Sequence, residues 1–164
     1  MSAKGIRDID VIRTFVLQGT LNFTRYFFKI RQKRKFVIGK HHREIAAALD
    51  KVLCGEITRL IINIAPRYGK TELAVKNFIA EGLAINPKAK FIHLSYSDDL
   101  ARDNSRGVQD IINEPEYRRI FPATIPTSTN TKKWYTTEGG GLYAVSSAGQ
   151  VTGFGAGLVD EEEN

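Results

Sequence analysis

The sequence predicts an α/β fold in which a mostly parallel central sheet lies between layers of helices. An apolar, β-branched run at residues 58–64 predicts a strand buried on both faces. A proline- and glycine-containing turn at 65–69 joins this strand directly to a helical pattern at 70–84. A second strand pattern at 90–96 leads into another helical pattern at 98–113. Strands that alternate with helices in this way are typical of parallel sheets.

The turn has the composition of a phosphate-binding loop, or Walker A motif. The stretch reads Ile64-Ala65-Pro66-Arg67-Tyr68-Gly69-Lys70-Thr71-Glu72. In a strand–loop–helix unit, backbone N–H groups face the phosphates, a lysine reaches the outer phosphates and a hydroxyl binds Mg²⁺. We expect these roles for Lys70 and Thr71. The general pattern has a glycine where this chain has Ile64, so an ordinary connection between a strand and a helix is the alternative.

Three motifs, in the right order, resemble those of the large terminase subunits of tailed bacteriophages and prophages. They are the loop at 64–72, Ser95-Tyr96-Ser97-Asp98-Asp99-Leu100-Ala101, and the glycine-rich stretches Gly139-Gly140-Gly141 and Thr152-Gly153-Phe154-Gly155-Ala156-Gly157. The resemblance runs from about Lys40 to the last residue. It implies a P-loop NTPase fold of the RecA-like, or ASCE, type with three layers. It also implies a motor that couples ATP hydrolysis to the translocation of double-stranded DNA.

The resemblance further implies which residues bind the cofactors, ATP and Mg²⁺. The cofactor-binding residues would be Pro66, Arg67, Tyr68, Gly69, Lys70, Thr71 and Glu72, with Thr71 on the metal. An arginine inside the loop is common in the family, and Arg67 would approach the γ-phosphate as a catalytic group; an exposed loop arginine is the alternative. His42 occupies the place from which the family contacts the base. Two histidines in the first turn of a helix are also typical of solvent-exposed positions.

Hydrolysis needs carboxylates that hold magnesium and orient the attacking water. The candidates are Asp160 for the metal and Glu161 for catalysis. The apolar run before them is short and has glycines on its entry side, which favours a chain that stops inside the glycine-rich loop. The fold would then be incomplete at the C-terminus, without the nuclease domain of the family. We expect such a chain alone to hydrolyse ATP negligibly.

We expect two segments, a helical and basic one at 1–40 and a partial P-loop ATPase domain at 41–164. In the first, one helix should begin at Val11 and a second near residue 20. Basic side chains gather from residue 25 to residue 43 without an acidic residue. They are Arg25, Lys29, Arg31, Lys33, Arg34, Lys35, Lys40 and Arg43. Such a run favours a polyanion partner, and a solvated helix face is the alternative.

In the second segment, a helix at 41–53 should end at Gly55. A β-hairpin should pair residues 133–137 with 142–147 across Glu138-Gly139-Gly140. In that hairpin we expect Trp134 and Tyr143 to be packed. Asp98 and Asp99 should lie in the first turn of the helix at 98–113, where carboxylates are favourable without any catalytic role. A position near the nucleotide is the alternative that the resemblance implies.

The composition limits the classes of protein that need to be considered. The chain has 164 residues, 42% of them apolar and 26% charged, with a net charge of +6. No apolar run reaches the roughly 18 residues of a membrane span, and we see no signal peptide. We expect a protein of the bacterial host's cytoplasm. The lone Cys54 cannot form an internal disulfide, and we expect it to be a small buried hydrophobe.

The partners follow from the resemblance and the charge. They would be double-stranded DNA, the portal protein, the small terminase subunit and further copies of the chain in the assembled motor, with no membrane. Two alternatives remain. One is another P-loop nucleic-acid motor such as a helicase. The other is a truncated prophage remnant without catalysis, which at most binds phosphate or DNA.

Overall fold

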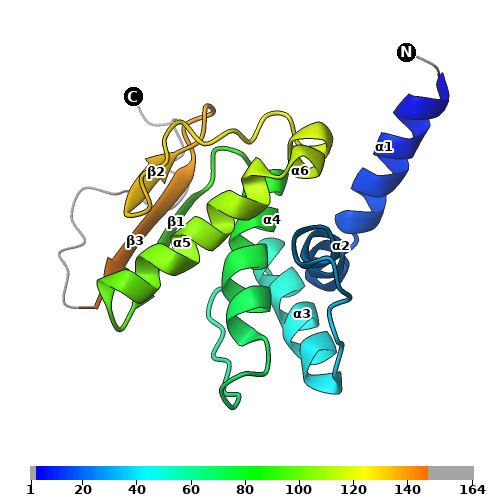
Figure 1. Cartoon of the computed structure of the whole chain (residues 1–164). Coiled ribbons are helices and arrows are strands. Elements are labelled where there is room, and N and C mark those ends of the chain that lie inside the picture. Colours follow the sequence, from blue (N-terminus) through cyan, green and yellow to red (C-terminus); the bar gives the residue numbers. More distant parts are fainter. Residues whose placement is uncertain (1–2, 148–164) are drawn as a thin grey trace.

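The computed structural model describes residues 3–147, which form a mixed α/β structure (Figure 1). The helices are α1 Ala3–Val16, α2 Thr20–Gln32, α3 Lys40–Leu53, the π-helical turn η1 Glu72–Asn77, α4 Phe78–Ile85, α5 Asp98–Asn113 and α6 Pro115–Ile120. The strands are β1 Lys90–Ser95, β2 Lys133–Tyr135 and β3 Gly141–Ser146. Helix α5 covers one face of the sheet, and α4 lies between α5 and the N-terminal helices. No helix among the described residues is long and apolar enough to cross a bilayer.

Within residues 3–147 the strands form one sheet in the order β1-β3-β2. Strand β1 is parallel to β3, from the pair Lys90↔Gly141 to the pair Ser95↔Ser146. Strand β2 is antiparallel to β3, which confirms the predicted hairpin. Trp134 is buried, and its indole Nε1–H donates to Ser105 Oγ on α5 at 2.9 Å. The sheet is therefore mixed, where we expected a mostly parallel one.

Residues 58–64 do not form the central strand that their composition predicts. None of these residues is buried, and Ile61 is 86% exposed. The physical reason is that a strand requires a hydrogen-bonded neighbour. The described residues place no strand beside this run. The prediction of burial on both faces was therefore wrong.

Several local predictions are confirmed. Helix α5 begins where expected, and Ser97 Oγ accepts a hydrogen bond from the N–H of Leu100 at 3.3 Å as its cap. Helix α3 ends before Gly55, whose φ of 78° is left-handed. Two predictions were wrong. Helix α1 begins at Ala3 rather than at Val11, and Cys54 is exposed because it caps the end of α3.

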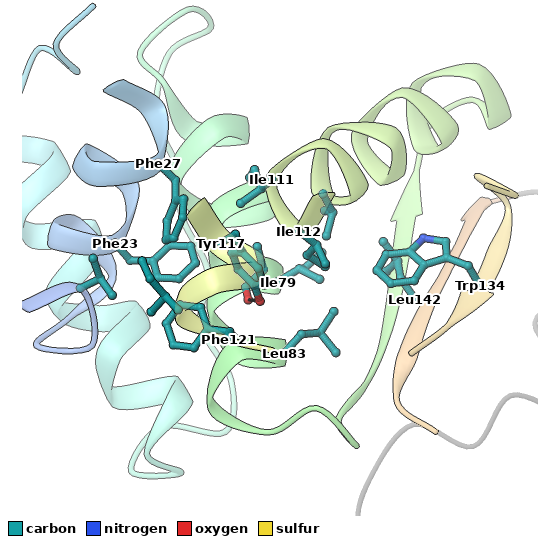
Figure 2. Packing of buried hydrophobic residues seen from close by; sticks show 14 residues of the cluster. Phe23, Phe27, Ile79, Leu83, Ile111, Ile112, Tyr117, Phe121, Trp134 and Leu142 are labelled. Carbon is teal, nitrogen blue, oxygen red and sulfur yellow. Dashed lines mark hydrogen bonds between the residues drawn. The ribbon is translucent and has the colours of Figure 1, made fainter. Parts of the chain in front are cut away.

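One hydrophobic core joins the N-terminal helices to the rest of the structure (Figure 2). Phe23 and Phe27 of α2 pack against Tyr117 of α6, with the Phe27 and Tyr117 ring centroids 5.3 Å apart. The hydroxyl of Tyr117 donates to the carbonyl of Ala80 in α4 at 2.8 Å. Toward the sheet, the same cluster reaches Trp134. The predicted segments 1–40 and 41–164 therefore share one core, and this core fixes η1 and α4, the helical stretch that follows the phosphate loop.

Candidate phosphate-binding site

The loop before η1 turns sharply at two left-handed residues. Arg67 has φ 68° and Gly69 has φ 74°, on either side of Tyr68, whose φ is negative. A left-handed conformation is free for glycine but costs about 1–2 kcal/mol for arginine. Alternating left- and right-handed residues turn successive N–H groups toward one side, an arrangement that binds anions. The turn at Gly69 therefore has two left-handed residues within three positions.

The helix that follows starts at Lys70 and Thr71, as predicted, at the lower end of the η1–α4 stretch in the view of Figure 1. The N–H of Leu73 donates to the carbonyl of Gly69 at 3.0 Å. From Glu72 onward this helix has the wider π-helical geometry of η1. Within η1, the side-chain amide of Asn77 donates to the carbonyl of Glu72 at 2.8 Å. Single π-helical turns of this kind are frequent at functional sites.

A hollow of about 440 Å³ opens at the loop. Its lining is Ile64, Ala65, Pro66, Arg67, Gly69, Lys70, Thr71 and Glu72. Lys70 and Thr71 are exposed, and neither side chain has a bonding partner within residues 3–147. The predicted residues of the loop are therefore together around one hollow, except Tyr68, which lines a second one together with His42. An ammonium and a hydroxyl remain available there for an anion.

The second hollow, of about 510 Å³, adjoins the first. Arg67, Gly69 and Glu72 border both. Its other lining residues are Phe28, Arg34, Lys35, Phe36, Val37, Ile38, Gly39, His41, His42 and Tyr68. A lining of aromatic rings and aliphatic side chains suits a flat organic ring. The analysis of the sequence missed Phe28 and Phe36, and the aromatic residue just before the helix at 41–53 was the available signal.

Glu72 is held from three directions. Its Oε1 lies 3.1 Å from Arg31 Nη1 and 3.1 Å from Asn77 Nδ2, and its Oε2 lies 3.8 Å from Lys76 Nζ. The side chains of Arg31 and Glu72 are only 10% and 18% exposed. Arg31 is therefore occupied with fixing the helix start. The other basic residues of the run from Arg25 to Arg43 are exposed.

His42 is buried, at 7% exposure, which contradicts the solvent-exposed alternative. Its Nδ1 accepts a hydrogen bond from the N–H of Gly39 at 2.9 Å, and its Nε2 lies 2.9 Å from the carbonyl oxygen of Tyr68. Burial lowers the pKa of His42. Both ring nitrogens are thus engaged by backbone, and only the ring itself borders the second hollow.

Asp98 lies away from both hollows. Its Oδ1 accepts a hydrogen bond from the N–H of Ser146 at 2.8 Å, and this hydrogen bonding lowers the pKa of the carboxyl. The bond ties the start of α5 to the end of β3. This structural role explains the position of Asp98 without a contact to a nucleotide.

Few groups in the described residues could hold a metal ion. No cluster of three or more histidine, cysteine, aspartate or glutamate side chains with that capacity occurs in residues 3–147. Glu72 borders the first hollow, but it is already bonded to Arg31, Asn77 and Lys76. The Thr71 hydroxyl is the ligand that remains, and it fits Mg²⁺ held mainly by phosphate oxygens and water. The candidates Asp160 and Glu161 lie outside the described residues.

No family model, curated protein or solved structure matches this chain. The function therefore has to be inferred from the loop, the two hollows and the motifs of the sequence.

Proposed function

We propose that this chain is the ATP-binding part of a phage DNA-packaging motor, the large terminase subunit. In the full-length protein, this part would couple ATP hydrolysis to the translocation of double-stranded DNA. The observation that carries the proposal is the turn at Arg67 and Gly69, which opens into a helix that presents Lys70 and Thr71 to a hollow. The order of the motifs along the chain supports the same class of protein.

Each residue of the loop has a role in this proposal. The Lys70 ammonium binds the β- and γ-phosphates, and the Thr71 hydroxyl orients Mg²⁺, which neutralises phosphate charge when it is bound. Arg67 is exposed at the turn and approaches the γ-phosphate. The base occupies the neighbouring hollow, between the rings contributed by residues 28–42 and that of Tyr68.

The exposed basic side chains from Arg25 to Arg43 supply a surface for DNA in this proposal. By resemblance, the portal protein, the small terminase subunit and further copies of the chain are its partners in the bacterial cytoplasm. A second function, binding without catalysis as in a prophage remnant, is favoured by one observation. Within residues 3–147, no unpaired carboxylate borders the phosphate hollow.

A titration with a fluorescent ATP analogue and Mg²⁺ tests nucleotide binding. The wild-type chain should bind, and Lys70→Ala should weaken binding about tenfold or more, because a charge-assisted contact to phosphate is lost. Lys88→Ala is the matched control, since Lys88 is an exposed lysine that lines neither hollow. A wild-type chain that fails to bind, or a Lys70→Ala variant that binds equally well, would overturn the proposal.

A further inference from the structure

The ring of His42 connects two pieces of backbone that are distant in the sequence. On one side it meets the N–H of Gly39, the residue before α3, at 2.9 Å. On the other it meets the carbonyl oxygen of Tyr68, inside the phosphate loop, at 2.9 Å. No other side chain in the described residues forms a hydrogen bond to the backbone of residues 66–69. His42 is therefore the side-chain attachment of the turn to the helical layer.

These two contacts determine which tautomer His42 has. A backbone N–H can only donate and a carbonyl can only accept, so Nδ1 must carry the lone pair and Nε2 the proton. His41 Nε2 lies 3.2 Å from the same Nε2. If His41 donated to it, the carbonyl of Tyr68 would lose its donor. The neutral ring with the proton on Nε2 is thus the form that satisfies both backbone groups.

The packing leaves the ring little freedom. The ring centroid of His42 lies 4.9 Å from that of Phe36 and 3.9 Å from that of His41. The loop passes directly over the ring at Gly69, where an added Cβ would lie 2.9 Å from His42 Nε2. A change in the protonation of His42 therefore acts on the loop at Tyr68 and Gly69.

We propose that His42 is a positioning residue of the phosphate loop, and that the loop holds its phosphate-binding shape only while His42 is neutral. A second proton, on Nδ1, would face the N–H of Gly39 and replace a hydrogen bond with two opposed donors. Because the packed ring cannot turn freely, this repulsion would displace the backbone around it and loosen the contact with Tyr68. This inference rests on the proposed function of the loop as a phosphate site.

The charged side chains around His42 also favour its neutral form. Arg34 and Lys35 border the ring's hollow from the segment before α3, and Arg67 borders it from the loop. The carboxylate there, Glu72 of η1, is already paired with Arg31 of α2. On its own helix, the ring faces His41. The pKa of His42 lies below the ordinary 6.5 because burial lowers it most and His41 lowers it further, while the hydrogen bond to Tyr68 acts in the opposite direction.

Substitution of His42 by glutamine separates the effect of its two hydrogen bonds from the effect of its protonation. In His42→Gln, the amide oxygen can accept from Gly39 and the amide nitrogen can donate to Tyr68, and the side chain does not titrate. His42→Phe keeps a ring but makes neither bond. His93→Gln is the matched control, because His93 lies on β1, contacts Asn104 and borders neither hollow.

The affinity for the fluorescent ATP analogue should be measured between about pH 5 and about pH 8 for all four proteins. Wild type and His93→Gln should lose affinity toward acid more steeply than His42→Gln, which keeps the nucleotide and His41 but lacks the titration of His42. His42→Phe should bind about 2- to 10-fold more weakly than wild type near neutral pH. Equal pH profiles of wild type and His42→Gln, or wild-type affinity in a folded His42→Phe, would overturn the inference.

A measurement without nucleotide keeps this inference apart from the proposed function. The ¹⁵N shifts of the His42 ring should show a neutral imidazole with the proton on Nε2. Exchange of the amide protons of residues 67–70 should be faster in His42→Phe than in His42→Gln. The opposite tautomer, or equal exchange in the two variants, overturns the role of His42 even if ATP binds. Failure of the wild type to bind ATP instead rejects the proposed function.

Discussion

Arg31 and Glu72 form an ion pair between α2 and the start of the helix that follows the phosphate loop, with Nη1 and Oε1 3.1 Å apart. The pair connects a residue of the basic segment to the first residue of η1. Because both side chains are largely shielded from water, the remaining partner would be left poorly solvated if one were removed.

Arg31→Ala should therefore lower the free energy of unfolding by about 1–3 kcal/mol. Chemical denaturation followed by circular dichroism measures this change. Arg25→Ala is the control on the same helix, because Arg25 is exposed, and its effect should stay within about 0.5 kcal/mol. Equal effects of the two substitutions would show that the pair contributes little.

Gly69→Ala should impair the loop in two ways. The left-handed φ of 74° costs about 1–2 kcal/mol for alanine, and the new methyl group meets His42 Nε2. We expect weaker binding of the fluorescent ATP analogue together with a lower melting temperature. Gly139→Ala is the matched control, because Gly139 has φ 89° with nothing within 4 Å of an added Cβ. It should lower the melting temperature and leave binding unchanged.

The buried Glu81 should give the chain an unusual dependence on pH. Burial raises its pKa to about 8, with Asp50 nearby as a further cause and Thr20 acting in the opposite direction. Because the pKa of Glu81 is higher in the folded chain than its ordinary value of 4.5, the folded state binds a proton that the unfolded state has lost. The stability linked to this proton is fully present below pH 4.5 and is lost as the pH rises to about 8. Glu81→Gln should remove this dependence on pH and stabilise the chain at alkaline pH by up to about 5 kcal/mol. Thermal unfolding at several pH values measures this; a Glu81→Gln variant as pH-sensitive as wild type would contradict it.

Turnover should be negligible even where ATP binds. Within residues 3–147 the one carboxylate at the hollow, that of Glu72, is already paired, and a missing catalytic group typically costs about 10²–10⁴-fold. Lys70→Ala should consequently weaken binding while leaving the measured phosphate release unchanged. Robust, DNA-stimulated release that disappears in Asp160→Ala or Glu161→Ala would establish these residues as the metal-binding and catalytic pair.

The local features of the fold could be predicted from the sequence. The cap at Ser97, the left-handed Gly55 and the hairpin before Gly141 depend on a few adjacent residues, so their patterns were sufficient. The strand at 58–64 could not be decided in this way. Its apolar residues indicate β propensity, but pairing depends on which other segment lies alongside, and that is a property of the whole fold.

For the candidate site, too, the features formed by adjacent residues could be predicted and those formed by distant residues could not. The loop from Pro66 to Thr71 is contiguous, so its composition predicted the hollow that it lines. Phe28 and Phe36 line the second hollow together with Tyr68, which is distant in the sequence, and periodicity contains no information about such an arrangement. The burial of His42 was missed for the same reason, since the loop that covers it lies 26 residues further along the chain.

The run Leu60-Ile61-Ile62-Asn63-Ile64 also affects how the isolated chain behaves at high concentration. It has no charge, a high β propensity and no strand partner within residues 3–147, a combination that promotes cross-β association between molecules. Arg59 before the run and Pro66 after it oppose such growth, one by repulsion and one by lacking an N–H. Protein concentration, more than temperature, should therefore limit how long the isolated chain stays dispersed.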